Sequence, residues 1–286
     1  MFNLKDKLLE EYGEDITQKI IDGYEAKRCV TLRVNTSLTN NDYIEQILKN
    51  NNIQFEKVEL LLNAYIIKNK TEEDIKKLDI YNNGYIYLQS LSSQIPPIFM
   101  DLHDNEQILD MAAAPGGKTT EMANIAKVMI TACEKNKIRC ERLKYNIDKQ
   151  NAKRINVMQK DARDLDDFFT FDKILLDAPC SGSGTLDKCE LDEDLINRSV
   201  TFQKELLSKA IKLVKKDGLI VYSTCSILKE ENEDIIKEHL GKDLELIPID
   251  TTIYDLPLLP TTLNGVLCLY PNELYEGFFI SILKKK

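Results

Sequence analysis

Residues 107–120 read Gln-Ile-Leu-Asp-Met-Ala-Ala-Ala-Pro-Gly-Gly-Lys-Thr-Thr, and this stretch decides the fold. It begins as a short apolar strand, passes through small residues and a Pro-Gly-Gly turn, and enters a helix near Lys118. Open α/β sheets form cofactor pockets where a strand runs into such a turn at a helix N-terminus. The glycines let the backbone approach a ligand closely, and the first helical turn presents unpaired N–H groups.

Three interpretations of this turn are open. Gly117-Lys118-Thr119 is similar to the end of a phosphate-binding P-loop, but that motif requires a glycine where the chain has Ala112. A purely structural turn would need no ligand. The third interpretation, the nucleoside pocket of a methyltransferase, depends on the later segments. The chain has no dinucleotide fingerprint G-x-G-x-x-G beside them, which disfavours a nicotinamide or flavin cofactor.

Composition narrows the class of protein. The 286 residues suffice for one large domain or two modest ones, and the apolar fraction of 43% supports a sizeable core. No apolar run approaches the roughly 18–20 residues that span a bilayer, and the charged N-terminus lacks a secretory signal, so we expect a cytoplasmic protein. The net charge of −9 disfavours a nucleic-acid binder without excluding one, because the distribution of charge matters more than the sum.

The cysteines argue against a metal site and against a disulfide framework. Their number is odd and no pair has C-x-x-C spacing, so free thiols in a reducing compartment are the simpler interpretation. We therefore expect no metal. The seven positions are Cys29, Cys133, Cys140, Cys180, Cys189, Cys225 and Cys268.

Residues 1–84 predict a small α+β domain, which in the alternative interpretation is only an extension packed on the main domain. A joint near residues 82–84 ends it. The expected elements are two short helices over 1–26, a strand at 30–36, a helix at 41–50, strands at 54–60 and 64–69, and a polar helix at 71–78.

Residues 85–286 predict an α/β domain with a parallel, doubly wound sheet and the last two strands as an antiparallel edge. Pro96 and Pro97 are expected near the first turn of a helix that begins at about Ser92. The expected strands are 85–90, 107–111, 128–133, 155–159, 172–177, 218–223, 244–249, 265–269 and 278–283, with helices at 117–126, 136–150, 201–214 and 230–239.

Acids or cysteines follow five successive strands of this domain. Ligands of such sheets bind at the carboxyl ends of the strands, so these side chains predict one pocket. S-adenosylmethionine carries no phosphate, and a small-residue turn with acids suits it; Glu134 is placed to accept hydrogen bonds from ribose hydroxyls. The residues at the strand ends are Asp110, Glu134, Asp161, Asp177 with Cys180, and Cys225.

Cys180 and Cys225 lie just past two strands, beside small polar residues. Two structural cysteines are the alternative interpretation. Carbon 5 of cytosine is a weak nucleophile toward a methyl sulfonium, and a thiolate that adds at carbon 6 activates it. A second thiol could assist the later release of the first. A nearby cation should lower the pKa of the attacking thiol, and Lys118 is the candidate.

Taken together, these segments resemble the RsmB/NSUN (Sun-type) RNA cytosine-5 methyltransferase family over about residues 30–286. The combination of Ala-Ala-Pro-Gly-Gly-Lys-Thr, Asp-Ala-Pro-Cys-Ser-Gly and Ser-Thr-Cys-Ser is specific, although each motif alone is weak. The chain departs from the family pattern at Ala112, at Leu186–Ser199 and at Pro271–Glu276, and the two longer segments bear on the choice of RNA. The resemblance rests on Arg33–Thr36, Gln89–Ser93, Asp110–Thr119, Asp177–Gly182, Ser223–Ser226 and Gly277–Ile280.

The resemblance implies a Rossmann-like class I methyltransferase domain behind an RRM-like, RNA-binding N-terminal domain. It implies that Cys225 is the nucleophile, that Cys180 helps to release the product, and that Lys118 and Asp177 border the target base. The implied substrate is a cytosine in rRNA, with tRNA second; a non-catalytic assembly factor of the same fold is the alternative. The implied S-adenosylmethionine-binding residues are Ala112, Ala113, Ala114, Pro115, Gly116, Gly117, Lys118, Glu134, Arg139, Asp161 and Asp177.

The target base must be presented unstacked, as in a single strand or loop, and a basic segment could hold the RNA phosphates near the pocket. A solvated helix face is the alternative for that segment. No segment marks a self-association surface, so we expect a monomer. An NTPase and a methyltransferase of proteins or small molecules are further function classes. The basic residues are Lys135, Lys137, Arg139, Arg142, Lys144, Lys149, Lys153 and Arg154, with Lys27, Arg28 and Arg33 from the N-terminal region.

Overall fold

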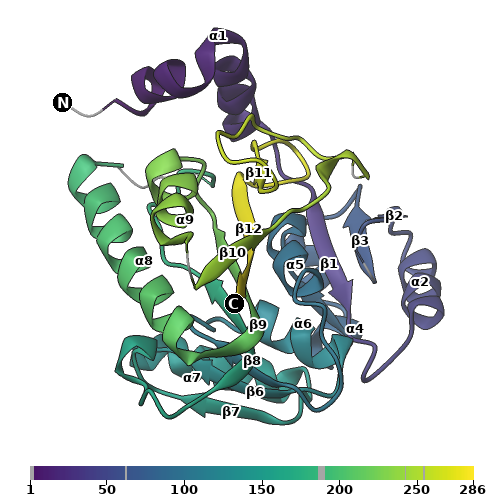
Figure 1. Ribbon diagram of the computed structural model, residues 1–286. Helices are drawn as coiled ribbons and strands as arrows, with labels where there is room; N and C mark the ends of the chain where they lie inside the picture. The colour runs from purple at the N-terminus through teal and green to yellow at the C-terminus, as the bar shows by residue number, and fades with distance from the viewer. Residues whose placement is uncertain (1–2, 62, 186–190, 242, 254) are drawn as a thin grey trace. The chain divides into compact units, whose positions relative to one another are not determined.

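The computed structural model describes residues 3–61, 63–185, 191–241, 243–253 and 255–286, which form two compact units (Figure 1). One unit is Cys29–Asp161, and the other combines Met1–Arg28 with Ala162–Lys286. This division differs from the expected boundary at residue 84. Within the described ranges, no helix is long and apolar enough to cross a membrane.

The unit Cys29–Asp161 begins with a four-stranded antiparallel sheet in the order β2-β3-β1-β4. The chain order strand, helix, strand, strand, helix, strand with this sheet order is the expected RRM-like arrangement. Leu32 and Val34 pair with Leu88 and Ile86, so the sheet extends past residue 84. Its elements are β1 (Val30–Val34), α2 (Asn41–Asn50), β2 (Phe55–Lys57), β3 (Ala64–Ile67), α3 (Glu72–Lys76), α4 (Asp79–Asn82) and β4 (Ile86–Leu88).

Both faces of this small sheet are covered. Leu32 and Val34 pack into a core with Ile44 of α2. Successive side chains of a strand alternate between faces, so Thr31 and Arg33 point the other way, and both are buried there. RRM domains stack RNA bases on an open sheet face. The expectation that Arg33 contacts RNA is therefore wrong, because its side chain is buried under other parts of the same unit.

The same unit continues with three parallel strands in the order β5-β6-β7, which the sequence predicted. Helix α5 begins at Leu91, where the Ser90 hydroxyl caps the Ser93 N–H, so Pro96 and Pro97 lie in its last turn rather than its first. The elements are α5 (Leu91–Ile98), β5 (Gln107–Asp110), α6 (Gly117–Ile125), β6 (Met129–Cys133), α7 (Lys137–Lys149) and β7 (Ile155–Met158).

The other unit begins with α1 (Leu4–Glu25), which is kinked at Gly13 and corresponds to the two predicted short helices. The hydroxyls of Tyr12 and Tyr24 donate to the carbonyls of Ile227 and Ser183, each at 2.5 Å. The helix therefore packs on the C-terminal part of the chain.

Arg28 also contacts the C-terminal part of the chain, because its guanidinium donates to the carbonyls of Asn272 and Tyr275. Both bonds use one nitrogen of the guanidinium, and Arg28 is half-buried, whereas Lys27 is exposed. The expectation that these two residues hold RNA stays a prediction.

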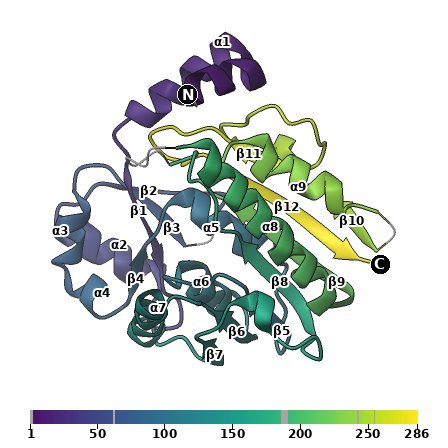
Figure 2. The same cartoon turned by 90° about the vertical axis from the view of Figure 1, so that its left-hand side faces the viewer.

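The sheet of this unit has the order β10-β12-β9-β8, with β8 and β9 parallel and β11 paired to β12 (Figure 2). Strand β12 lies between β9 and β10 and is antiparallel to both, so the antiparallel edge is β10 and not the last two strands. Helix α8 starts at Glu193 rather than at residue 201, because Asp192 caps it. The main elements are β8 (Phe171–Asp177), α8 (Glu193–Leu213), β9 (Val214–Thr224), α9 (Glu233–His239), β10 (Leu244–Ile247), β11 (Leu267–Leu269) and β12 (Phe278–Lys285), with 3₁₀ turns η1 (Ala162–Asp164), η2 (Lys229–Glu231) and η3 (Thr251–Ile253).

Candidate active site

The turn between β5 and α6, residues 111–117 and here called the glycine loop, is fixed by β6 and α7. The Ala113 N–H donates to the Cys133 carbonyl at 2.9 Å. The Arg139 guanidinium donates to the Ala114 carbonyl and the Asn146 amide to the Pro115 carbonyl, both at 2.8 Å. Side chains of one neighbouring helix thus set the path of this loop.

Gly116 is the residue before α6 and has a φ of 108°, a conformation that side chains with a Cβ rarely adopt. A Cβ at this position would lie 3.0 Å from Cδ1 of Leu143. The loop therefore needs glycine here both for its backbone angle and for its approach to α7. That the first N–H groups of α6 bind a ligand stays a prediction.

The predicted cofactor acids of this unit lie at the ends of β6 and β7. The buried Glu134 carboxylate accepts from the Asn136 N–H at 2.8 Å and lies 3.4 Å from the Arg139 guanidinium. Asp161 lies 3.8 Å from the Lys135 ammonium. The structure thus joins the glycine loop, Arg139 and Glu134 by direct contacts. Carboxylates beside a close-approach glycine turn fit the hydroxyls and amino groups of S-adenosylmethionine.

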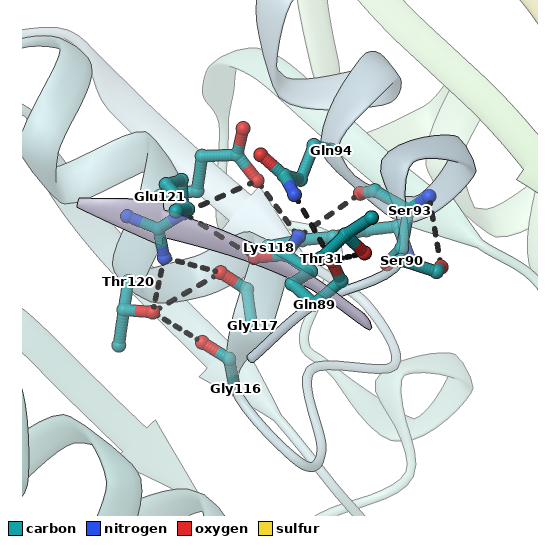
Figure 3. Close-up of polar contacts among 11 residues, drawn as sticks. Thr31, Gln89, Ser90, Ser93, Gln94, Gly116, Gly117, Lys118, Thr120 and Glu121 are labelled. Carbon is teal, nitrogen blue, oxygen red and sulfur yellow. Dashed lines mark hydrogen bonds and ion pairs between the residues drawn. The ribbon is translucent and has the colours of Figure 1, made fainter. Parts of the chain in front are cut away.

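Lys118 belongs to a buried polar network in the same unit (Figure 3). Its ammonium donates to the Ser93 hydroxyl at 2.7 Å. The Gln89 amide donates to the Ser93 carbonyl at 3.2 Å and to the Glu121 carboxylate at 2.8 Å. Lys118 is therefore oriented by α5 through Ser93, while its predicted effect on a thiol pKa stays a prediction.

A buried ion pair anchors this network to β1. The Arg33 guanidinium lies 3.8 Å from the Glu121 carboxylate and donates to the Gly117 carbonyl and the Thr120 hydroxyl at 3.3 and 3.1 Å. Burial raises the pKa of Glu121 to about 7 and lowers the pKa of Arg33. Sequence reasoning missed Glu121, because one acid in a helix with no apolar periodicity carries no signal of burial.

The two predicted thiols meet in the other unit, because β8 and β9 are neighbours with Asp177 opposite Ser223. The Sγ atoms of Cys180 and Cys225 are 3.2 Å apart. The Ser223 hydroxyl donates to the Asp177 carboxylate at 2.8 Å. The structure therefore brings together the three predicted residues of this unit, Asp177, Cys180 and Cys225.

Exposure separates these two thiols from three of the other cysteines. Cys133, Cys140 and Cys268 are buried, whereas Cys180 and Cys225 are partly exposed, as is Cys29. Cys189 lies outside the described residues. The hydrogen bond with Cys225, together with burial, raises the pKa of the Cys180 thiol well above its usual range. Cys180 therefore keeps its proton and can donate it toward the Cys225 sulfur.

Glu231 of the turn η2 fastens both thiol loops and was missed by sequence reasoning. Its carboxylate accepts from the Ser181 N–H and hydroxyl at 2.7 and 2.6 Å, and from the Ser226 hydroxyl at 2.5 Å. It is fully buried, and burial raises its pKa. The surrounding Lys-Glu-Glu-Asn-Glu run is typical of a solvent-exposed segment, so no sequence pattern indicates this role. Among the residues that the structure describes, no cluster of His, Cys, Asp or Glu could hold a metal ion.

Comparison with known proteins agrees with this geometry. The chain is 36% identical over 217 residues to a tRNA (cytosine(72)-C(5))-methyltransferase of Pyrococcus horikoshii, covering 74% of this chain and 55% of the relative. It is 31% identical over 272 residues to ribosomal RNA small subunit methyltransferase F of Shewanella amazonensis, covering 90% and 58%. The chain thus spans about half the length of the curated relatives it matches.

A solved structure and a family profile complete the comparison. The structure of a methyltransferase homolog protein from Pyrococcus horikoshii is 28% identical, covers 100% of both chains and superposes with a TM-score of 0.86. The expected Rossmann-like methyltransferase fold is therefore confirmed. Residues 97–284 match the family described as 16S rRNA methyltransferase RsmB/F. This chain belongs to that family of RNA methyltransferases.

Proposed function

We propose that this chain transfers a methyl group from S-adenosylmethionine to carbon 5 of a cytosine in RNA. The observation that carries the proposal is the 3.2 Å approach of the Cys180 and Cys225 sulfurs at the ends of adjacent parallel strands. Its support includes relatives that are named cytosine-C(5)-methyltransferases of tRNA and rRNA. A methyltransferase of proteins or small molecules would have no use for paired thiols.

S-adenosylmethionine supplies the electrophilic methyl group when it is bound. In this proposal the glycine loop, from Ala112 to Gly117 and on to Lys118, approaches it by backbone. Glu134 accepts from its ribose hydroxyls, and Arg139 keeps both the loop and Glu134 in place. Asp161 and Asp177 supply the remaining carboxylates at the strand ends.

The thiols act on the base. The Cys225 thiolate adds to carbon 6 of cytosine and forms a carbon–sulfur bond, which makes carbon 5 nucleophilic toward the methyl group. In this proposal Asp177, oriented by Ser223, accepts from the exocyclic amine of cytosine. Cys180 then gives its proton to the departing Cys225 sulfur and takes the proton of carbon 5 as the carbon–sulfur bond breaks. Cys180 is then a thiol again, and Cys225 returns to the thiolate by losing one proton to solvent, so one proton is released for each methyl group transferred.

The test is incubation with methyl-labelled S-adenosylmethionine and total RNA that lacks 5-methylcytosine, followed by nucleoside analysis and mapping. We expect 5-methylcytosine at a defined position in rRNA, and none with Cys225→Ser. Label in tRNA alone would show that the substrate is tRNA instead of rRNA. No label in any RNA, with a folded protein that binds S-adenosylmethionine, would overturn the enzymatic proposal in favour of an assembly factor. Activity of Cys225→Ser equal to wild type would overturn the covalent mechanism.

The proposal also includes a cytoplasmic monomer that needs no metal. The thiol chemistry is balanced by side chains alone, so methylation should be unaffected by EDTA. Light scattering of the active protein should give the 32.9 kDa mass of one chain. Loss of activity in EDTA that Mg²⁺ restores without changing RNA folding would contradict the metal-free mechanism.

A further inference from the structure

The outer side of α7 carries an unusual row of side chains, here called the α7 stripe: Ile138, Arg142, Tyr145 and Lys149. Their spacing places them on one side of the helix. Ile138 is 77% exposed and Tyr145 is 62% exposed. Single exposed apolar residues are ordinary, but two within two helical turns, flanking an exposed arginine, form a surface that a flat aromatic partner would fit.

The charge around the α7 stripe is opposite to that of the whole chain. Residues 135–154 contain eight lysines and arginines and only two acids, whereas the chain carries a net charge of −9. Of these residues, Arg142 is exposed and Lys149 places its ammonium 3.5 Å from the ring centre of Tyr81, next to α4. The stripe is therefore a local cationic and aromatic surface, which suits a polyanion with stacking bases.

The α7 stripe runs beside the glycine loop. Arg139 and Asn146, which hold the carbonyls of that loop, occupy the adjacent side of the same helix. A helix rises only about 5.4 Å per turn, so the stripe lies within about two turns of the side chains that hold the loop. In the proposed reaction the methyl donor on this loop must touch the target base. This position is what a surface for the RNA that flanks the target would need.

Two other surfaces fit RNA less well. The face of the small sheet that RRM domains use is buried here, as Arg33 shows. The exposed pair Phe168 and Phe169 follows Asp166 and Asp167, which would repel phosphates. The α7 stripe combines exposed aromatic and apolar surface with positive charge.

We propose that the α7 stripe binds the single-stranded RNA next to the target cytosine, with a base stacked on Tyr145 against Ile138 and a phosphate paired with Arg142. This inference rests on the proposed function. It assigns RNA recognition to the helix that also positions the glycine loop, so that binding of RNA and placement of the methyl donor share one element.

The test is fluorescence anisotropy with a short, labelled single-stranded RNA containing cytosines. Tyr145→Ala should weaken binding about tenfold, from the loss of one stacked base. Arg142→Gln should weaken binding and reduce the slope of log affinity against log salt by about 1. The control is Phe168→Ala, which removes an aromatic ring that is even more exposed than Tyr145 and should leave RNA affinity unchanged. Affinity for S-adenosylmethionine should be the same in all four proteins.

Each outcome separates this inference from the proposed function. Wild-type RNA affinity in Tyr145→Ala and Arg142→Gln overturns the inference, even if the wild-type protein forms 5-methylcytosine. No binding of the RNA by the wild type at low salt overturns it too. Weakened binding in both variants supports it, even if no 5-methylcytosine forms, in which case the enzymatic proposal fails alone.

Discussion

The glycine loop and the thiol pair both follow strand ends, but different kinds of side chain hold them in place. The glycine loop is anchored by a buried ion pair, Arg33 with Glu121, and by side chains that bond its carbonyls. The thiol loops are anchored by one buried carboxylate, Glu231, that accepts from serine groups on both. A charge pair thus fixes the backbone of the glycine loop, whereas a single carboxylate ties the two thiol loops to each other.

The thiol pair gives the largest expected effect. Cys180→Ala removes the group that completes release, so turnover should fall by about 10²–10⁴-fold, and an RNA–protein adduct should survive denaturing electrophoresis. In the double variant with Cys225→Ser the adduct should disappear. Full turnover by Cys180→Ala would assign Cys180 a structural role. The thiol pair would then no longer differ from the glycine loop by a chemical role of both its cysteines.

The ion pair gives the next largest effect, on stability. Above the Glu121 pKa of about 7, where its carboxylate is ionised, Arg33→Met leaves that carboxylate buried without its cation, and the free energy of unfolding should fall by about 3–5 kcal/mol. Urea unfolding measures it. The double variant Arg33→Met/Glu121→Met should recover much of the loss, because neither charge is then left unpaired. If the double variant is less stable than either single variant, the anchor is something other than this charge pair.

Sequence patterns predicted the parallel strands, most of the helices and the residues at the strand ends, because strand and turn signals are local. They also predicted that Cys180 and Cys225 share a cleft, since the strands before them are consecutive. The roles of the two thiols came only from family resemblance.

Local sequence patterns did not predict the residues that hold the glycine loop and the thiol loops in place. Arg33 looked like an RNA-binding cation, because nothing in the alternating strand around it shows that both sheet faces are covered. Helix α1 looked like part of the N-terminal domain, because the bonds of Tyr12 and Tyr24 join residues more than 150 positions apart. Glu121 and Glu231 lie in segments that read as solvated. Sequence patterns alone did not predict which charged side chains are buried by segments that lie far away in the chain.

The buried carboxyl of Glu121 should make the free energy of unfolding depend on pH. The folded protein holds its proton up to a pKa of about 7, whereas the ordinary value is 4.5. Its contribution to stability is therefore complete below pH 4.5 and is lost as the pH rises toward 7, by about 3 kcal/mol in total. Between these pH values the unfolding free energy of wild type should fall more steeply than that of Glu121→Gln. Parallel curves for the two proteins would show that Glu121 is ionised throughout.

The smallest expected effect tests whether the glycine loop needs its backbone angle for binding. Gly116→Ala places a Cβ at a φ of 108° and 3.0 Å from Leu143, which costs about 1–3 kcal/mol. If the loop shifts to relieve that strain, affinity for S-adenosylmethionine, measured by calorimetry, should fall by about five- to a hundredfold. Gly13→Ala is the matched control, since Gly13 has a φ of 75° and open space around it. The control should lose stability and keep its affinity. Equal affinities in both variants would show that the loop tolerates displacement, and that its anchoring by α7 and Arg33 serves the fold rather than the methyl donor.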